Sequence, residues 1–110
     1  MLRIKNSQLG NIIFALTDLG NRTNDIKVKW EFRKTLTPFL NANSILQDQI
    51  NEIIKEEGEK GRLDPLNKTY KELLDCDIEV DSKTFTLEEL DKYNPTVEHL
   101  IALEPLIEEI

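Results

Sequence analysis

The sequence contains little cysteine, histidine and glycine, and each shortage excludes a class of site. With one cysteine, Cys76, and one histidine, His99, the chain cannot form an internal disulfide or an HExxH metal motif. The four glycines form no GxGxxG, GxxxxGKS/T or GxSxG motif, so the usual phosphate-binding loops and nucleophile elbow are absent. We therefore expect no enzymatic activity, no cofactor and no bound metal.

Long apolar runs are also missing. The longest covers residues 12–16, far short of the roughly 20 apolar residues that cross a bilayer. The first residues include two cations but neither the continuous apolar segment nor the small-residue cleavage site of a secretory signal. We expect a cytosolic protein without a membrane span, and the lone cysteine is consistent with a reducing compartment.

The charge of the chain is negative and unevenly distributed. We expect residues 1–110 to form a single domain, and a composition of 39% hydrophobic and 32% charged residues is typical of a soluble, folded chain. Residues 1–55 carry eight Lys/Arg and five Asp/Glu, hence +3, whereas residues 56–110 carry six and sixteen, hence −10. This balance disfavours direct nucleic-acid binding, although it can steer a protein partner.

The first 21 residues predict a strand and a helix. Residues 2–5 alternate apolar and basic side chains, which is the period of a strand at a sheet edge. Asn6 or Ser7 can then cap a helix, which we expect Gly20 to end in a left-handed conformation. The apolar residues of this helix recur at spacings of three and four: Leu9, Ile12, Ile13, Leu16 and Leu19.

A long helix is predicted from about residue 25 to about residue 60. Pro38 removes an interior hydrogen bond, so we expect a bend there, with a break into two helices as the alternative. Asn43 lies within the apolar stripe, where it would fix the register of paired helices or instead mark a bend or a bound water. The stripe has a heptad-like spacing over about three repeats: Phe32, Leu36, Phe39, Asn43, Leu46, Ile50 and Ile53.

Glycine and proline divide the remainder into short elements. Gly58 and Gly61 are the expected stops of the long helix, and Asp64-Pro65 predicts the start of the next. The side chains that should face inward from that helix are Leu66, Tyr70, Leu73 and Leu74. Residues 77–81 alternate acidic and apolar side chains and predict a strand that pairs with residues 2–5, which would place acids opposite Arg3 and Lys5.

Two capping signals predict the last helices. Thr86 and Glu89 form a capping box for a short helix through Leu90, and Asn94-Pro95-Thr96 opens a last helix that Pro105 bends or ends. The residues expected to be buried there are Val97, Leu100, Ile101 and Leu103. Together these elements predict a mainly α, α+β fold in which a long bent helix packs with two to four shorter helices and a two-stranded antiparallel sheet.

Acidic residues occupy every second position from Asp75 to Asp81. A calcium loop that began at Asp75 would need glycine and glutamate where the chain has Val80 and Thr86, so this pattern is not an EF-hand. The alternation instead predicts a solvated strand face. We expect Cys76, which lies between two acids that disfavour its thiolate, to be inert. His99 is expected at the surface or half-buried.

The segment KVKWEFRK, residues 27–34, combines the only tryptophan with four basic residues. At 100° per residue Trp30 lies about 160° from Phe32, on a side that it shares with Arg33 and Lys34. Trp30 could pack beneath another layer of the fold, anchor a protein interface, or stack on nucleic acid. Glu31 and the acidic C-terminal half oppose the third interpretation.

Five features occur in an order found in a known group of proteins. A short IKN strand and a first helix precede IKVKWEFRK at the entry to a long helix, and YKELLDCDIEVDSKTFTLEEL precedes a terminal helix. Over nearly its whole length the chain thus resembles a group of small proteins of unknown function encoded by tailed bacteriophages. It departs from them in having Pro38 inside the long helix and a shorter segment around residues 58–63. The resemblance implies a phage origin and no known enzymatic activity, and it assigns no functional residue.

We therefore expect a viral protein that acts by protein–protein interaction in the host cytoplasm or on the virion. The first hypothesis is an assembly or virion-associated accessory protein that self-associates or binds a larger phage protein through the long helix. The candidate contacts are Trp30, Arg33, Lys34 and Asn43. The alternative is an inhibitor of a host defence protein that presents an acidic face, with Asp77, Glu79 and Asp81, in place of nucleic acid.

Overall fold

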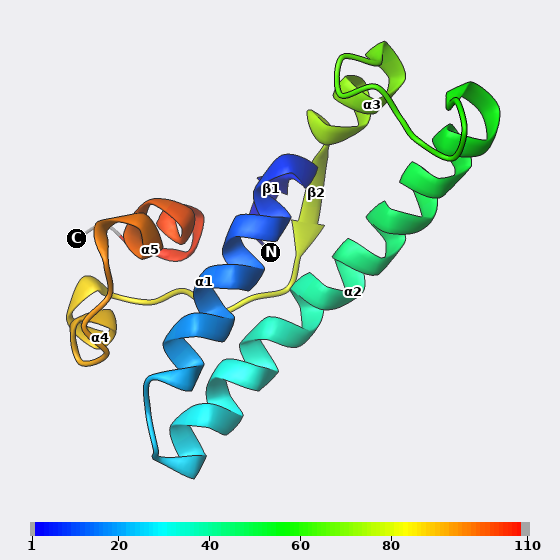
Figure 1. Ribbon diagram of the computed structural model, residues 1–110. Coiled ribbons are helices and arrows are strands. Elements are labelled where there is room, and N and C mark those ends of the chain that lie inside the picture. Colours follow the sequence, from blue (N-terminus) through cyan, green and yellow to red (C-terminus); the bar gives the residue numbers. More distant parts are fainter. Residues whose placement is uncertain (1, 109–110) are drawn as a thin grey trace.

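The computed structural model describes residues 2–108 and confirms the mainly helical α+β class (Figure 1). A long helix, several short helices and a two-stranded antiparallel sheet are present, as the sequence predicts. In chain order the elements are β1 (Leu2–Lys5), the 3-10 turn η1 (Asn6–Gln8), α1 (Leu9–Asn21), α2 (Ile26–Glu57), α3 (Lys68–Leu74), β2 (Asp77–Val80), α4 (Leu87–Asp91), α5 (Val97–Ala102) and the 3-10 turn η2 (Glu104–Leu106).

An antiparallel pair of helices, α1 and α2, forms the centre of the molecule (Figure 1). Asp25 caps α2, because its Oδ1 accepts a hydrogen bond from the Lys27 backbone N–H at 2.9 Å. Gly20 was expected to end α1 in a left-handed conformation, but it lies inside the helix. A Cβ at Gly20 would come within 3.3 Å of the Cβ of Phe32, so this glycine lets the two helices approach closely.

The apolar stripe of α2 packs as the sequence predicts. Phe32, Leu36, Phe39 and Leu46 are buried, and Asn43 is half-buried. The helix continues through Pro38, so the alternative of two separate helices is wrong. The hydroxyls of Thr35 and Thr37 donate to the carbonyl oxygens four residues earlier, a pattern that together with proline is typical of helix bends. The bend itself and the role of Asn43 stay predictions.

The connection from α2 to α3, residues 58–67, is longer than predicted. Gly58 caps α2 with extended backbone, and Lys60 and Gly61 both have positive φ in a hairpin turn of the type I′ pattern. Asp64 does not start the next helix, because its Oδ1 accepts from the Leu66 N–H at 2.9 Å and forms a local turn. The prediction that Leu66 faces inward is therefore wrong, and this side chain is exposed.

Asn67 is the residue that caps α3, with its Oδ1 accepting from the Tyr70 N–H. Of the side chains predicted to face inward from this helix, Tyr70, Leu73 and Leu74 are half-buried. The three-residue delay in the start of α3 follows from the competition between the Asp64 turn and a helical cap.

The sheet confirms the predicted pairing of the N-terminal strand with residues 77–81. Strands β1 and β2 are antiparallel, with Arg3 opposite Glu79 and Lys5 opposite Asp77. The inner face carries Ile4 and Val80, which are both buried in the core. Alternation along the two strands therefore places the charged residues on the outer face, where opposite charges are neighbours.

The two C-terminal caps are confirmed, but the buried face of α5 differs from the prediction. Thr86 caps α4 and Thr96 caps α5. Val97 and Ile101 were expected to be buried, and both are exposed, whereas Leu103 is buried as expected. His99, placed by the sequence at the surface or half-buried, is buried instead. Val97 and Ile101 are one turn apart and lie roughly opposite His99 on the helix. The side of α5 that carries His99 therefore faces the core.

A matched pair of substitutions tests where the core lies. Ile12 on α1 is fully buried and Ile45 on α2 is 63% exposed. We expect Ile12→Ala to lower the free energy of unfolding by about 2–5 kcal/mol, because it leaves a cavity, and Ile45→Ala to change it by less than about 0.5 kcal/mol. Urea denaturation of the three proteins measures both effects, and equal losses would contradict this packing.

Candidate functional site

The N-terminal third of α2 presents an uncovered apolar surface. Trp30 is 63% exposed and Ile26, one turn earlier on the same side of the helix, is 76% exposed. Phe32, on the opposite side, is buried against the rest of the fold. The interpretation that Trp30 packs beneath another layer of the protein is therefore wrong for this chain. Two large apolar side chains that remain side by side in solvent mark a candidate contact site.

Basic side chains flank this apolar pair. Ile26, Lys27, Lys29, Trp30, Glu31 and Arg33 line one shallow surface of α2, and Lys34 follows Trp30 by one turn. We name this surface the Trp30 face and define it by Ile26, Lys27, Lys29, Trp30, Glu31, Arg33 and Lys34. One of its cations has a carboxylate nearby, since the Lys34 Nζ lies 3.7 Å from the Glu31 Oε1. The face therefore combines an apolar centre with a positive rim.

The remaining predicted contacts lie elsewhere in the fold. Asn43 is half-buried in α2, thirteen residues and about 20 Å along the helix from Trp30. Asp77 and Glu79 belong to β2, and Asp81 follows that strand. The structure thus brings Trp30, Arg33 and Lys34 together on one face, and it places Asn43 and the acidic residues at two other sites.

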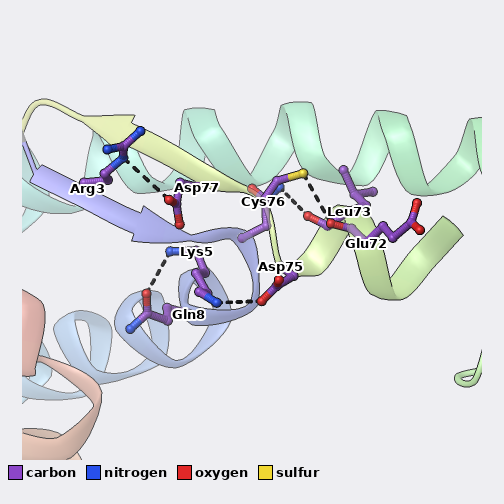
Figure 2. A network of polar contacts seen from close by, with 9 residues as sticks. Arg3, Lys5, Gln8, Glu72, Leu73, Asp75, Cys76 and Asp77 are labelled. Atoms are coloured by element: carbon purple, nitrogen blue, oxygen red, sulfur yellow. Dashed lines mark hydrogen bonds and ion pairs between the residues drawn. The ribbon is translucent and has the colours of Figure 1, made fainter. Parts of the chain in front are cut away.

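The acidic row of β2 has cations beside it (Figure 2). The Arg3 Nε lies 3.6 Å from the Asp77 Oδ2, and the Lys5 Nζ donates a hydrogen bond to the Asp75 Oδ1 at 2.6 Å. Glu79 is the cross-strand partner of Arg3. The outer face of the sheet is therefore mixed in charge rather than uniformly negative.

The ion pair at Lys5 also affects its titration. The hydrogen bond and the charge of Asp75 hold the pKa of Lys5 above its ordinary value of 10.5, with a further contribution from Asp77. Figure 2 shows this lysine between the end of β1 and the turn before β2. The same turn contains Cys76, which is exposed and whose thiol donates to the Glu72 carbonyl oxygen.

A buried histidine that the sequence does not predict connects α5 to α1. The His99 Nδ1 accepts from the Thr96 N–H at 3.0 Å, and this bond places the ring proton on Nε2, which lies 2.6 Å from the Asp18 Oδ2. Asp18 is also 3.6 Å from the Arg22 guanidinium. Both ring nitrogens of His99 are thus engaged in holding the structure. The available sequence signal was its position three residues after Thr96, where a capping box has its second polar residue.

A second group of exposed apolar residues lies where α1 meets α5. Phe14, Val97 and Ile101 are all exposed, and Phe14 and Ile101 border a hollow of about 360 Å³ between the two helices. This surface could not be predicted from the sequence, because Val97 and Ile101 match the helical spacing of a buried face. Among residues 2–108 no helix is long and apolar enough to cross a membrane, and no group of three acids, cysteines or histidines could hold a metal ion.

Comparisons with known proteins identify no relative of this chain. Neither protein-family models nor curated proteins nor solved structures give a match. The resemblance to the bacteriophage group therefore stays a prediction. A proposal about function therefore has to be argued from the exposed residues of the molecule itself.

The Lys5–Asp75 pair predicts a pH dependence of stability. Because the pKa of Lys5 is raised on folding, its contribution is present below pH 10.5 and is lost as the pH rises through the higher pKa of the folded state. We expect the stability difference between the native sequence and Lys5→Met to shrink in that alkaline range. Asp75→Asn should reduce this pH dependence, because only the smaller effect of Asp77 remains. A stability difference that stays constant with pH would contradict the prediction. Urea denaturation at a series of pH values measures the difference.

The buried position of His99 predicts that two neighbouring substitutions in α5 differ in their effect on the free energy of unfolding. His99→Leu removes the acceptor of the Thr96 N–H and one of the two partners of the Asp18 carboxylate, so we expect a loss of about 1–3 kcal/mol in the free energy of unfolding. Glu98→Leu makes the same replacement at the neighbouring exposed position and should cost less than about 0.5 kcal/mol. Thermal and urea denaturation give both values, and similar losses would show that the His99 contacts do not stabilise the fold.

Proposed function

We propose that this protein acts by binding another protein through the Trp30 face, as an assembly or virion-associated accessory protein of a tailed bacteriophage. The observation that carries the proposal is the exposure of Trp30 and Ile26 together on a helix whose other side is buried. Burying the exposed part of the Trp30 side chain on a partner would contribute on the order of 3 kcal/mol. Tryptophan and arginine are also the residues most enriched at energetically dominant contacts.

The arrangement of charge on this face supports a protein partner. An apolar centre with a polar rim is the common anatomy of protein interfaces. Lys27, Lys29, Arg33 and Lys34 form a positive rim around Trp30, so the best fit is an acidic surface on the partner. Residues 56–110 of this same chain carry a net charge of −10, so a second copy is one candidate partner and self-association belongs to the proposal.

The phage setting rests on the sequence resemblance alone. Within it, an accessory protein would meet its partner in the host cytoplasm or on the assembling virion. The alternative function, an inhibitor that presents acids in place of nucleic acid, has less support. Arg3 and Lys5 lie beside the acidic row of β2, which reduces the negative field that such an inhibitor needs.

Trp30→Ala tests the proposal directly. We expect it to weaken binding to the partner by tenfold or more while changing the free energy of unfolding by less than about 0.5 kcal/mol, because the side chain is exposed. Self-association is measured by sedimentation velocity of the purified protein. Binding to other partners is measured by biolayer interferometry against individually purified head and tail proteins of the encoding phage.

Phe14→Ala is the matched control, since it removes an exposed aromatic side chain from α1 rather than from the Trp30 face. It should leave binding at the native level. Two results would overturn the proposal. One is a native protein that stays monomeric and binds none of these proteins, and the other is binding that survives Trp30→Ala unchanged.

A further inference from the structure

A groove runs between the first turns of α2 and the segment that leads into and out of α4. It has a volume of about 220 Å³. Val28 and Phe32 line it from α2, on the side of the helix opposite Trp30. The complete lining is Lys27, Val28, Glu31, Phe32, Lys83, Phe85, Glu89, Lys92 and Tyr93. The groove shares Lys27 and Glu31 with the Trp30 face.

The floor of the groove is a cluster of three aromatic rings. Phe32 stacks on Phe85 with ring centroids 6.0 Å apart, and it meets the edge of Tyr93 at 5.3 Å. Phe85 is held by backbone hydrogen bonds on both sides, to the Leu106 carbonyl oxygen and from the Glu108 N–H, each at 2.7 Å. The floor is therefore apolar and fixed in place before any ligand arrives.

The rim of the groove has a positive excess that the fold does not neutralise. Across the part of the chain that the structure describes, Lys27, Lys83 and Lys92 take part in no ion pair. The Lys83 ammonium instead lies 4.6 Å from the centre of the Phe85 ring. The rim also carries two acids, so its three lysines leave a net charge of +1. Glu31 pairs with Lys34, and Glu89 accepts a hydrogen bond from the uncharged Thr86 in the α4 capping box.

The size of the groove limits what can fill it. Sites for small molecules and cofactors occupy about 300–1,000 Å³, and a groove of about 220 Å³ falls below that range. It matches one large apolar side chain. Phe32 and Phe85 are buried at the floor, so most of the apolar surface that an inserted side chain can contact comes from the half-buried Val28 and Tyr93. An apolar anchor held by a protein segment is the ligand that fits both the volume and the floor.

We propose that this groove binds an acidic segment of a partner protein, with one aromatic or large aliphatic side chain inserted over Phe32, Phe85 and Tyr93. Carboxylates on either side of that anchor would pair with the ammonium groups of Lys27, Lys83 and Lys92. Burial of the inserted apolar side chain contributes to affinity. The lysines favour acidic over basic sequences. This site borders the Trp30 face at Lys27 and Glu31, but its lining does not include Trp30.

A labelled peptide tests the groove without knowledge of the natural partner. The probe is a fluorescein-labelled Glu-Glu-Phe-Glu-Glu peptide, titrated with the native protein and followed by fluorescence anisotropy. We expect saturable binding that weakens as salt is added, because the rim charges are exposed to solvent. Replacing the phenylalanine of the peptide with alanine, or its glutamates with lysines, should each weaken binding on the order of tenfold or more.

Charge reversal on the protein locates the site. Lys83→Glu combined with Lys92→Glu should raise the Kd for the acidic peptide on the order of tenfold. Lys60→Glu combined with Lys71→Glu makes the same change in net charge near α3, far from the groove, and should leave the Kd within about twofold. Urea denaturation of both double variants shows that they remain folded.

Four outcomes would overturn the proposal. These are the absence of saturable binding up to about 1 mM peptide, equal binding of the alanine-anchored peptide, equal losses in the two double variants, and tighter binding of an oligothymidylate than of the peptide. None of them depends on Trp30, so a failure here is distinct from a failure of the function proposed for the Trp30 face.

Discussion

The packing of α1 against the first half of α2 is the contact on which the rest of this fold depends. Leu9, Ile12, Leu16 and Leu19 of α1 are all buried in the core, α5 packs against α1, and β2 packs against α2. With 13 residues α1 is about 20 Å long, whereas α2, with 32, is about 48 Å long. One short helix cannot cover such a long one, so much of the surface of α2 faces solvent (Figure 1).

That difference in length explains where the candidate binding surfaces lie. The buried side of α2 is determined by contact with α1 and by the aromatic cluster around Phe32. The opposite side has no layer over it, which leaves Trp30 and Ile26 in water with cations around them. The Trp30 face and the lysine-rimmed groove therefore lie on two sides of the same helical turns. Both are positive surfaces on a protein whose overall charge is −7.

Polar contacts then fix the short C-terminal elements around this helical pair. The Asp18–His99 contact joins α1 to α5, and the Arg22 guanidinium donates to the Asn94 carbonyl oxygen at 2.7 Å. The pairing of residues 2–5 with residues 77–80 joins two segments that are far apart in the sequence. These contacts orient α5, whose apolar residues Val97 and Ile101 consequently face solvent rather than the core.

Much of the fold follows from the sequence because it depends on local chemistry. Periodicity, caps and alternation were sufficient to predict α1, α2, the β1–β2 pairing and the Thr86 cap, since each is decided by residues close in the chain or by matching charges. The tertiary structure alone decided that Trp30 is exposed, that His99 is buried against Asp18, and that Phe32, Phe85 and Tyr93 meet in one groove. Burial depends on whether a distant element covers a given face, and the spacing of residues along one helix contains no information about that cover.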